Sequence, residues 1–378
     1  MPYITDVSSN IIYSLNNELS LEVSITTESG INGKSSVVSI NKEYQELLKI
    51  VDIINKNIAP NLIGYDVREQ LVIDNLLLKK EFSDIDLNYI YAISQTLALT
   101  ASNYNKQQLF EYLGGFNAHI IPTPMINLST DDMINKIYIV PFDFKTYKEA
   151  LKCGLDIKQK YQELLKNNKK ELDSLESYLD IVMSSITNMG YKPGVNIGIS
   201  INFKAYSYYN QNTKQYMLKQ PIKVDELINY YEQLIKKYPI SSIEDPLSDL
   251  DKENWTKLTK RIGNKIQIIG NKFFTKDIER LEYSIKHNSV NAIAFNPSTF
   301  GTITQTFNII ENAKRAGYSI IVSSNELETE DSILADLAVS LSSNSIKCHS
   351  ITNYNQLIRI EDCLNGVSEF NNKKFLNK

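Results

Sequence analysis

Hydrophobic and polar residues alternate near the start of the chain. The segment 19–25 reads Leu-Ser-Leu-Glu-Val-Ser-Ile, so that every second residue is apolar. This period of two is typical of a strand with one buried face. A turn with two glycines at 29–33 predicts a second strand at 36–40. Apolar residues at helical spacing then predict three helices, at about 42–58, 66–80 and 87–103.

The rest of the chain repeats a strand followed by a helix about every 25–30 residues. Strands are expected at 195–203, 240–243, 266–269, 291–295, 319–322 and 345–348. Helices are expected at 145–165, 171–189, 225–238, 251–261, 276–287, 304–316 and 331–342. Such repeats indicate a parallel barrel or a doubly wound sheet. The barrel is favoured because no Gly-x-Gly-x-x-Gly sequence opens any of these helices.

Glycine and proline gather between the two patterns. Gly114, Gly115, Pro122 and Pro124 lie within fourteen residues, at 114–127, and such residues interrupt regular structure. The sequence therefore predicts an α/β protein with three parts: an α+β domain at 1–125, an α/β barrel at 126–365 and a frayed polar tail at 366–378.

Composition excludes several classes of protein. The 378 residues are 42% hydrophobic and 22% charged, which suits a globular core. A net charge of −4 argues against a nucleic-acid binder, because such proteins need a basic surface. The three cysteines are too widely spaced for a disulfide framework or a thiolate zinc site. Neither a membrane span nor a signal peptide is visible, so we expect a cytoplasmic protein, with surface display as the alternative.

The residues that follow the expected barrel strands are candidates for chemistry, because active sites of such barrels lie at the carboxyl ends of the strands. Glu244 and Asp245 follow the strand at 240–243. This acidic pair suits a metal or general-base site, and it equally suits a cap for the next helix. Polar residues that follow other strands are Asn271, Lys272, Asn296, Ser324 and Asn325.

The segment 242–247 reads Ser-Ile-Glu-Asp-Pro-Leu, with Trp255 shortly after it, and resembles the S-I-E-D-P-F…W segment of enolases (phosphopyruvate hydratases). Further similar segments follow the same order along the chain, at 112–115, 122–125, 266–270, 328–337 and 355–361. The chain is identified on these motifs as a member of the enolase family. The resemblance implies an N-terminal α+β domain followed by an atypical eight-stranded α/β barrel.

The resemblance also implies that the metal site of the family is degraded. Enolases hold Mg²⁺ with three acids, and the matching positions here are Ser200, Glu244 and Asn271. A further family aspartate is replaced by Lys272, which adds positive charge. Mg²⁺ requires near-octahedral oxygen ligands, so we expect no tight magnesium site and no other cofactor.

The family's proton-transfer residues are replaced as well. The lysine base matches Asn296, and losing a general base typically costs about 10²–10⁴-fold in rate. An acidic partner matches Lys136, and the phosphate-binding His-Arg pair matches Ser324 and Asn325. Three positions of the family's site keep their residue type: Glu244, Asp245 and Lys347.

Three functions are compatible with this pattern. The favoured one is a non-catalytic enolase homologue with a binding or scaffold role. The second is an enzyme with metal-independent chemistry that uses Glu244, Asp245 and Lys347, with His349 as a further candidate. The third is a working phosphopyruvate hydratase, which converts 2-phosphoglycerate to phosphoenolpyruvate in glycolysis.

Two further expectations concern binding. The lysines at 136, 272 and 347 face two acids at the barrel mouth, which predicts weak anion binding; the alternative is that Glu244 and Lys347 form a buried ion pair that fills the site. Enolases form dimers through an ion pair between subunits, and its two residues match Glu22 and Arg359. The resemblance therefore implies a homodimer, or a heterodimer with an intact enolase.

Overall fold

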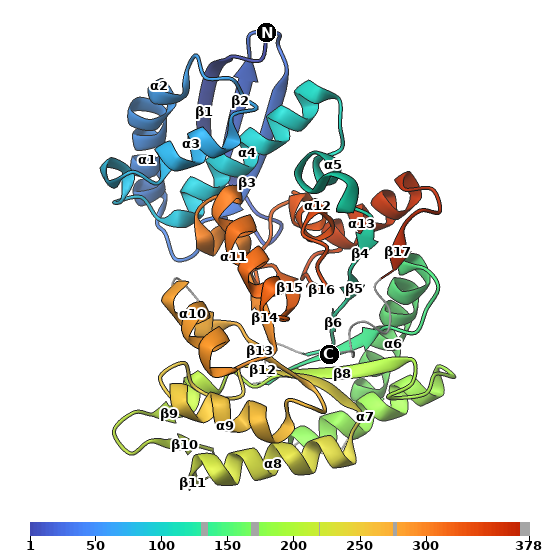
Figure 1. The fold of residues 1–378 in the computed structure, drawn as a ribbon. Helices are drawn as coiled ribbons and strands as arrows, with labels where there is room; N and C mark the ends of the chain where they lie inside the picture. The colour runs from blue at the N-terminus through green and yellow to red at the C-terminus, as the bar shows by residue number, and fades with distance from the viewer. Residues whose placement is uncertain (130–134, 168–173, 219, 275–277, 371–378) are drawn as a thin grey trace.

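The structure is a computed structural model that describes residues 1–129, 135–167, 174–218, 220–274 and 278–370. It has an N-terminal β-sheet with helices, packed against a larger unit in which helices surround a barrel (Figure 1). In the described ranges, no helix combines the length and the apolar character needed to cross a lipid bilayer. The α/β class and the two-part order expected from the sequence are confirmed.

The N-terminal sheet has three antiparallel strands in the order β1-β2-β3. The strands are β1 (Ile4–Tyr13), β2 (Leu19–Thr27) and β3 (Asn32–Val38). The expected period of two is confirmed on β2, where Leu21, Val23 and Ile25 are fully buried and Leu19, at the start of the strand, is partly buried. The start of β3 was wrongly predicted at residue 36, because Gly33 was assigned to the turn and not to the strand. Glycine is needed at this position of the strand, since a Cβ there would overlap the backbone and hydroxyl of Thr100.

Helices cover one face of this sheet and continue towards the barrel (Figure 1). The longest, α4 (Leu87–Asn105), packs against β3 and β2. The others are α1 (Tyr44–Ile53), the π-helix η1 (Ile54–Ile58), α2 (Ala59–Leu62), α3 (Gln70–Leu77), the short η2 (Lys80–Phe82), α5 (Leu109–Gly114) and η3 (Gly115–Asn117). The predicted helices at 42–58, 66–80 and 87–103 correspond to α1 with η1, α3 and α4.

The barrel is a nine-stranded sheet that closes on itself. Its order is β5-β16-β15-β14-β13-β12-β8-β7-β6, and the end strands β5 (Thr123–Pro124) and β6 (Ile126–Asn127) are successive parts of one segment. Counting that segment once leaves eight positions around the barrel, as the resemblance implied. The other strands are β7 (Lys136–Pro141), β8 (Ile197–Asn202), β12 (Ile240–Glu244), β13 (Gln267–Gly270), β14 (Ala292–Phe295), β15 (Ser319–Ser323) and β16 (Ser345–Lys347).

One strand runs against the others. The strand β7 is antiparallel to both neighbours, β6 and β8, whereas the remaining pairs in the barrel are parallel. This strand was not among those predicted from the sequence. Its first residue, Lys136, lies beside Asn202, the last residue of β8. The start of β7 therefore shares the barrel mouth with the ends of the parallel strands.

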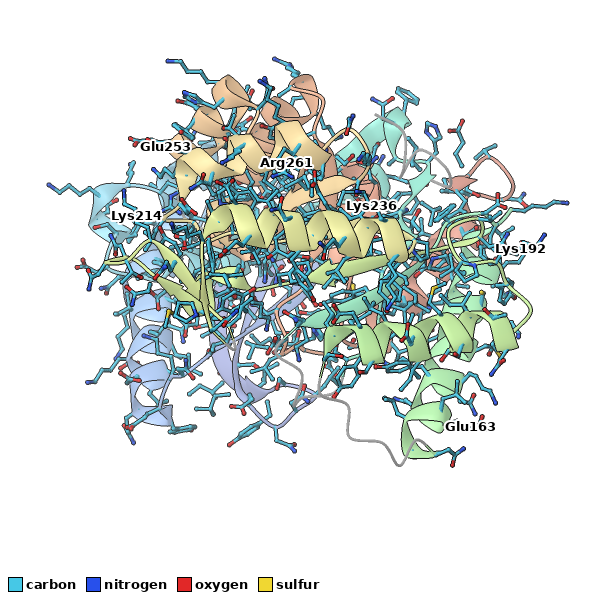
Figure 2. All side chains as sticks on the ribbon, turned by 90° about the horizontal axis from the view of Figure 1, so that it is seen from below. Glu163, Lys192, Lys214, Lys236, Glu253 and Arg261 are labelled. Atoms are coloured by element: carbon cyan, nitrogen blue, oxygen red, sulfur yellow. The ribbon has the colours of Figure 1, made fainter. Side chains whose placement is uncertain are left out.

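Helices surround the barrel and turn their apolar faces inward. They are α6 (Tyr147–Asn167), α7 (Leu175–Asn188), α8 (Val224–Lys237), α9 (Lys252–Ile262), α10 (Ile278–His287), α11 (Ile303–Arg315), α12 (Ile333–Ser340) and α13 (Ile351–Cys363). On α9, Trp255 is fully buried and its indole N–H donates to the Ser248 carbonyl oxygen. Seen from below, the labelled side chains Lys236 and Glu253 point outward from α8 and α9 (Figure 2). All seven predicted barrel helices exist, whereas α13 was not predicted.

Three smaller elements complete the fold. A sheet of β9 (Tyr209–Asn210), β10 (Gln215–Met217) and β11 (Pro221–Ile222) follows β8, and was not predicted. The strand β17 (Glu369–Phe370) pairs with β4 (Ile120–Ile121), and Phe370 is buried. The expectation of a frayed tail from residue 366 was therefore wrong for β17. Residues 371–378 of that tail lie outside the described part, and the domain boundaries stay predictions.

Hydrogen bonds join the N-terminal domain to the barrel. The Asp74 carboxylate accepts from the backbone N–H of Thr304, and the Ser94 hydroxyl accepts from that of Ile303, both at 2.9 Å. A second connection is made by the Asp331 carboxylate, which accepts from the backbone N–H and the hydroxyl of Ser36. The first contact satisfies free N–H groups at the start of α11, as helix caps do. These bonds fix the sheet and α4 above the barrel mouth.

A buried acid in α12 predicts a dependence of stability on pH. Burial raises the pKa of Asp336 to about 6, although its hydrogen bond from Gln356 opposes this. Between about pH 4 and pH 6 the folded protein keeps a proton that the unfolded chain releases, so the free energy of unfolding should fall as pH rises through this range. We expect a fall of about 2–3 kcal/mol from this residue.

Urea denaturation across this pH range checks the expectation. Asp336→Asn should flatten the profile by that amount, because the amide does not titrate. The exposed Asp84→Asn serves as the matched control and should keep the wild-type slope. A slope that is the same in Asp336→Asn and in the control would show that Asp336 does not carry the effect.

Candidate functional site at the barrel mouth

The carboxyl ends of the parallel strands bring several predicted site residues together. Glu244 is the last residue of β12, beside Asn202 of β8 and Ile269 of β13. Lys347 is the last residue of β16, beside Ser323 of β15. Along the sheet, β12 and β16 are four positions apart in a barrel of eight, so these two residues come from opposite walls.

Glu244 and Lys347 form an ion pair across the interior of the barrel. The Lys347 ammonium donates to both carboxylate oxygens of Glu244, each at 2.7 Å. Only 4% of the Lys347 side chain and 1% of the Glu244 side chain are exposed. Two charges so far from water are tolerated only with good geometry and further hydrogen bonds. The buried ion pair that was expected as the alternative is therefore present, whereas the weak anion binding set against it stays a prediction.

Two amides complete the surroundings of Glu244. The side-chain N–H groups of Asn202 and Asn271 donate to Oε1 of Glu244, at 2.9 and 2.8 Å. This oxygen thus accepts three hydrogen bonds, because Lys347 also donates to it. The carboxylate is held entirely by donors from this chain. Asn202 was not singled out in the sequence; the signal that could have found it is its position two residues after Ser200, on the same face of β8.

Asp245 has a different environment from Glu244. It adopts a left-handed backbone conformation, with φ of 43°, which is uncommon for residues other than glycine. Its carboxylate accepts from the backbone N–H groups of Asn271 and Lys272. Burial and then the nearby Glu244 raise the pKa of Asp245. Asp245 therefore anchors the start of the loop after β13.

The position matched to the first metal ligand holds a neutral contact. The hydroxyls of Ser200 and Ser242 are 2.7 Å apart, and both residues are fully buried. The interior of the barrel also holds an apolar cluster that includes Tyr138 and Ile269. The Lys347 ammonium lies 5.4 Å from the centre of the Tyr138 ring, close enough for a cation–π interaction.

A second ion pair spans the open side of the mouth. Lys204, just after β8, contacts Glu326, in the loop after β15, at 3.0 Å. These strands are also four positions apart in the barrel. The Glu326 side chain is 65% exposed and that of Lys204 29%, so this pair lies nearer to solvent than Glu244 and Lys347. Neither residue was singled out from the sequence.

The remaining candidates are dispersed around the mouth. The Asn296 side chain accepts from the backbone N–H of Ser298 and caps the short helix η6 (Pro297–Phe300). The Ser324 hydroxyl is 3.2 Å from Nδ1 of His349, and burial lowers the pKa of His349. The Lys272 ammonium lies 5.9 Å from the centre of the Tyr206 ring. Lys136 begins β7.

The two residues expected at a dimer contact lie away from the mouth, and each has a partner within its own chain. Glu22, on β2, is 3.9 Å from Lys34 and its side chain is 25% exposed. Arg359, on α13, is exposed and donates to the Gln356 side chain at 3.2 Å. These two residues do not contact each other within the chain.

A metal ion would find few ligands here. Across the ranges that the structure describes, no three His, Cys, Asp or Glu side chains gather closely enough to hold a metal ion. At the mouth, the acids Glu244 and Asp245 are already bonded to donors from this chain. The arrangement therefore holds the charges of Glu244, Asp245 and Lys347 in fixed positions.

Comparison with known families gives a match over most of the chain. The family model described as the enolase C-terminal TIM barrel domain matches residues 118–378. This range is more than half of the 378 residues. It includes β4 to β17, and thus the whole barrel and every residue of the mouth.

Proposed function

The chain belongs to the enolase family, and from this premise we propose that it is a non-catalytic member with a binding or scaffold role. The observation that carries the proposal is the buried contact between Glu244 and Lys347. In this reading, an ammonium of the chain itself supplies the positive charge that the family obtains from a metal ion. Two asparagine amides complete the set of donors.

The residues at the mouth do not fit magnesium. Of the three positions matched to family ligands, only Glu244 is an acid, and its oxygens accept from Lys347, Asn202 and Asn271. Mg²⁺ needs oxygen ligands in an octahedron and is bound by carboxylates, whereas amide N–H groups and an ammonium repel it.

The residues matched to the chemistry of the family have other contacts. The Asn296 amide oxygen, at the position of the lysine base, caps η6. Metal-independent chemistry by Glu244 and Lys347 is disfavoured too, because each neutralises the other.

Thermal denaturation with magnesium tests this proposal. We expect the midpoint to stay unchanged in millimolar Mg²⁺, because a ligand stabilises a protein only when it binds the folded state. A calcium titration provides the control for general ionic effects. A rise of several degrees that is specific to Mg²⁺ would mean that the mouth still binds the metal, and it would contradict a non-catalytic role that rests on the ion pair.

We also propose that the protein acts as a dimer, with itself or with an intact enolase, in the cytoplasm. The support is that Glu22 and Arg359 keep the residue types of the family's intersubunit pair. Both side chains reach solvent and bind only weakly within the chain. A non-catalytic subunit that keeps this surface could change the activity or location of its partner.

Weak anion binding at the mouth stays a prediction. Lys347 is committed to Glu244, and Lys204 to Glu326. The lysines that remain to bind an anion are Lys136, the first residue of β7, and Lys272, two residues after the end of β13. A phosphate titration followed by NMR should therefore show at most weak binding.

A further inference from the structure

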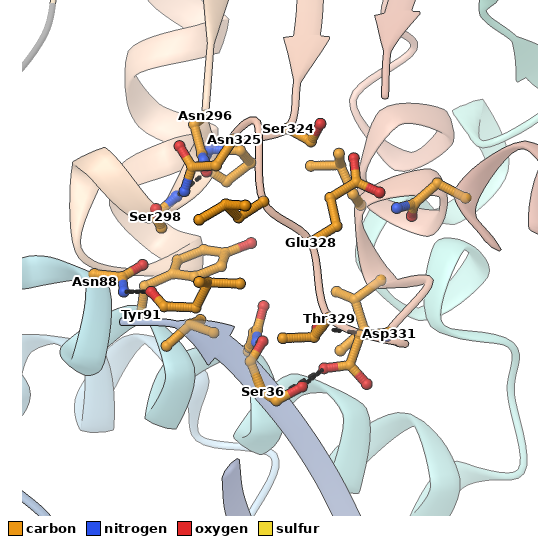
Figure 3. A pocket seen from close by; sticks show the side chains of 18 residues that line it. Ser36, Asn88, Tyr91, Asn296, Ser298, Ser324, Asn325, Glu328, Thr329 and Asp331 are labelled. Atoms are coloured by element: carbon orange, nitrogen blue, oxygen red, sulfur yellow. Dashed lines mark hydrogen bonds between the residues drawn. The ribbon is translucent and has the colours of Figure 1, made fainter. Parts of the chain in front are cut away.

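A small pocket lies between the N-terminal domain and the barrel mouth (Figure 3). One wall comes from β3 and α4, and the other from η6 and the loop that follows β15. Its volume is about 100 Å³, enough for a few water molecules or one small molecule, at about 30 Å³ for each water. Neither Glu244 nor Lys347 lines it, so it is separate from the buried ion pair.

Tyr91 presents a free hydroxyl to this pocket. The residue is only 5% exposed, and Figure 3 shows its hydroxyl pointing toward the middle of the pocket. Among the described residues we find no hydrogen bond to this hydroxyl. This hydroxyl faces the pocket and is therefore available to donate or accept a hydrogen bond with a ligand there.

The charge of the pocket is negative. Its lining includes two carboxylates, Glu328 and Asp331, and no Lys, Arg or His among the described residues. Glu328 accepts from the backbone N–H groups of His349 and Ser350, and Asp331 from Ser36, which leaves further lone pairs on both. Burial, and to a lesser extent the nearby Glu330 and Glu22, raise the pKa of Asp331, whereas its hydrogen bonds from Ser36 lower it. An anion such as a phosphate ester is therefore disfavoured.

The rest of the polar lining can both donate and accept hydrogen bonds. It consists of amides and hydroxyls, among them Asn296, Ser298, Ser324 and Asn325. Such groups suit hydroxyl groups of a ligand, while the carboxylates suit a positive charge. The volume limits the ligand to a handful of non-hydrogen atoms.

We propose that this pocket is a binding site for a small hydroxylated ammonium compound, a short amino alcohol, whose hydroxyl bonds to Tyr91. Its ammonium is favoured by the field of Glu328 and Asp331. This inference goes beyond the non-catalytic role and does not depend on it, because the pocket and the ion pair have no residue in common. An empty pocket would leave the ion pair and its consequences unchanged.

The test uses the full chain with ethanolamine as the probe, at pH 7 in low salt, followed by calorimetry or NMR. Ethylene glycol and glycolate serve as neutral and anionic probes of similar size. We expect saturable binding of ethanolamine, about tenfold weaker binding of ethylene glycol, and no binding of glycolate or phosphate at this pocket.

Three variants tie the binding to the pocket. Tyr91→Phe removes one hydrogen bond and should weaken ethanolamine binding about fivefold. Tyr89→Phe, on the same helix but outside the pocket, is the matched control and should bind like the wild type. Asn325→Asp adds a negative charge to the lining and should tighten ethanolamine binding. This variant tests the proposal even if Tyr91→Phe does not fold.

Several results would overturn the proposal. They are the absence of saturation up to tens of millimolar ethanolamine, glycolate binding at least as strong as ethanolamine binding, and an unchanged affinity in Asn325→Asp. Wild-type affinity in a folded Tyr91→Phe variant would also overturn it. None of these results bears on magnesium or on turnover, which test the proposed function separately.

Discussion

Replacement of Lys347 by methionine is expected to lower the free energy of unfolding by about 3–5 kcal/mol. Methionine is also unbranched but one heavy atom shorter, and the change removes the ammonium, so that a carboxylate that is 1% exposed is left without its counter-charge. The Asn202 and Asn271 amides remain, but neutral donors do not replace a positive charge. Urea denaturation at pH 7 measures the loss.

Two further variants separate the ion pair from simple packing. Lys204→Met removes the exposed pair with Glu326 and should cost only about 0–1 kcal/mol. Glu244→Gln combined with Lys347→Met removes both buried charges and should recover most of the stability lost in Lys347→Met. A loss below about 1 kcal/mol in Lys347→Met would show that the pair does not hold the barrel mouth together.

Replacement of Arg359 by glutamate is expected to shift the protein from dimer to monomer. In a twofold dimer each contact occurs twice. One substitution therefore places a glutamate opposite Glu22 at both contacts, where the two negative charges repel. Breaking a desolvated pair costs about 2–5 kcal/mol for each contact. Sedimentation equilibrium at micromolar concentration measures the change in the dissociation constant.

The reversed pair provides the decisive control for the dimer. Glu22→Arg added to Arg359→Glu should restore part of the assembly, because it re-creates an opposite pair with the charges exchanged. Arg315→Glu, on the exposed face of α11, is the matched control and should leave assembly unchanged. A wild-type protein that sediments as a monomer at tens of micromolar would contradict the dimer.

The repeated part of the fold could be predicted because each of its strands is short, apolar and followed by an amphipathic helix. The segment 319–322 and the helix that precedes it at 304–316 correspond closely to β15 and α11. The strand β7 was missed because it breaks this repeat: it is antiparallel, and all but its first residue are buried. The strands β5 and β6 have two residues each, too few to show any period.

The site could be predicted only in part. The matched positions singled out Glu244, Asn271 and Lys347, and allowed the buried ion pair as one of two outcomes. The choice between these outcomes depends on contacts between distant parts of the chain. Asn202 is 42 positions from Glu244 in the sequence, and Lys347 is 103 positions from it. Local patterns carry no information about such pairs, which the closure of the barrel brings together.

Dehydration of 2-phosphoglycerate with excess magnesium tests the central claim most directly. The purified chain, free of any intact enolase, should show turnover at least about 10⁴-fold below that of an intact enolase measured alongside, because it lacks the general base and two acidic ligands. Glu244→Gln should leave any residual rate unchanged. Robust magnesium-dependent turnover that is lost in Glu244→Gln would contradict the account.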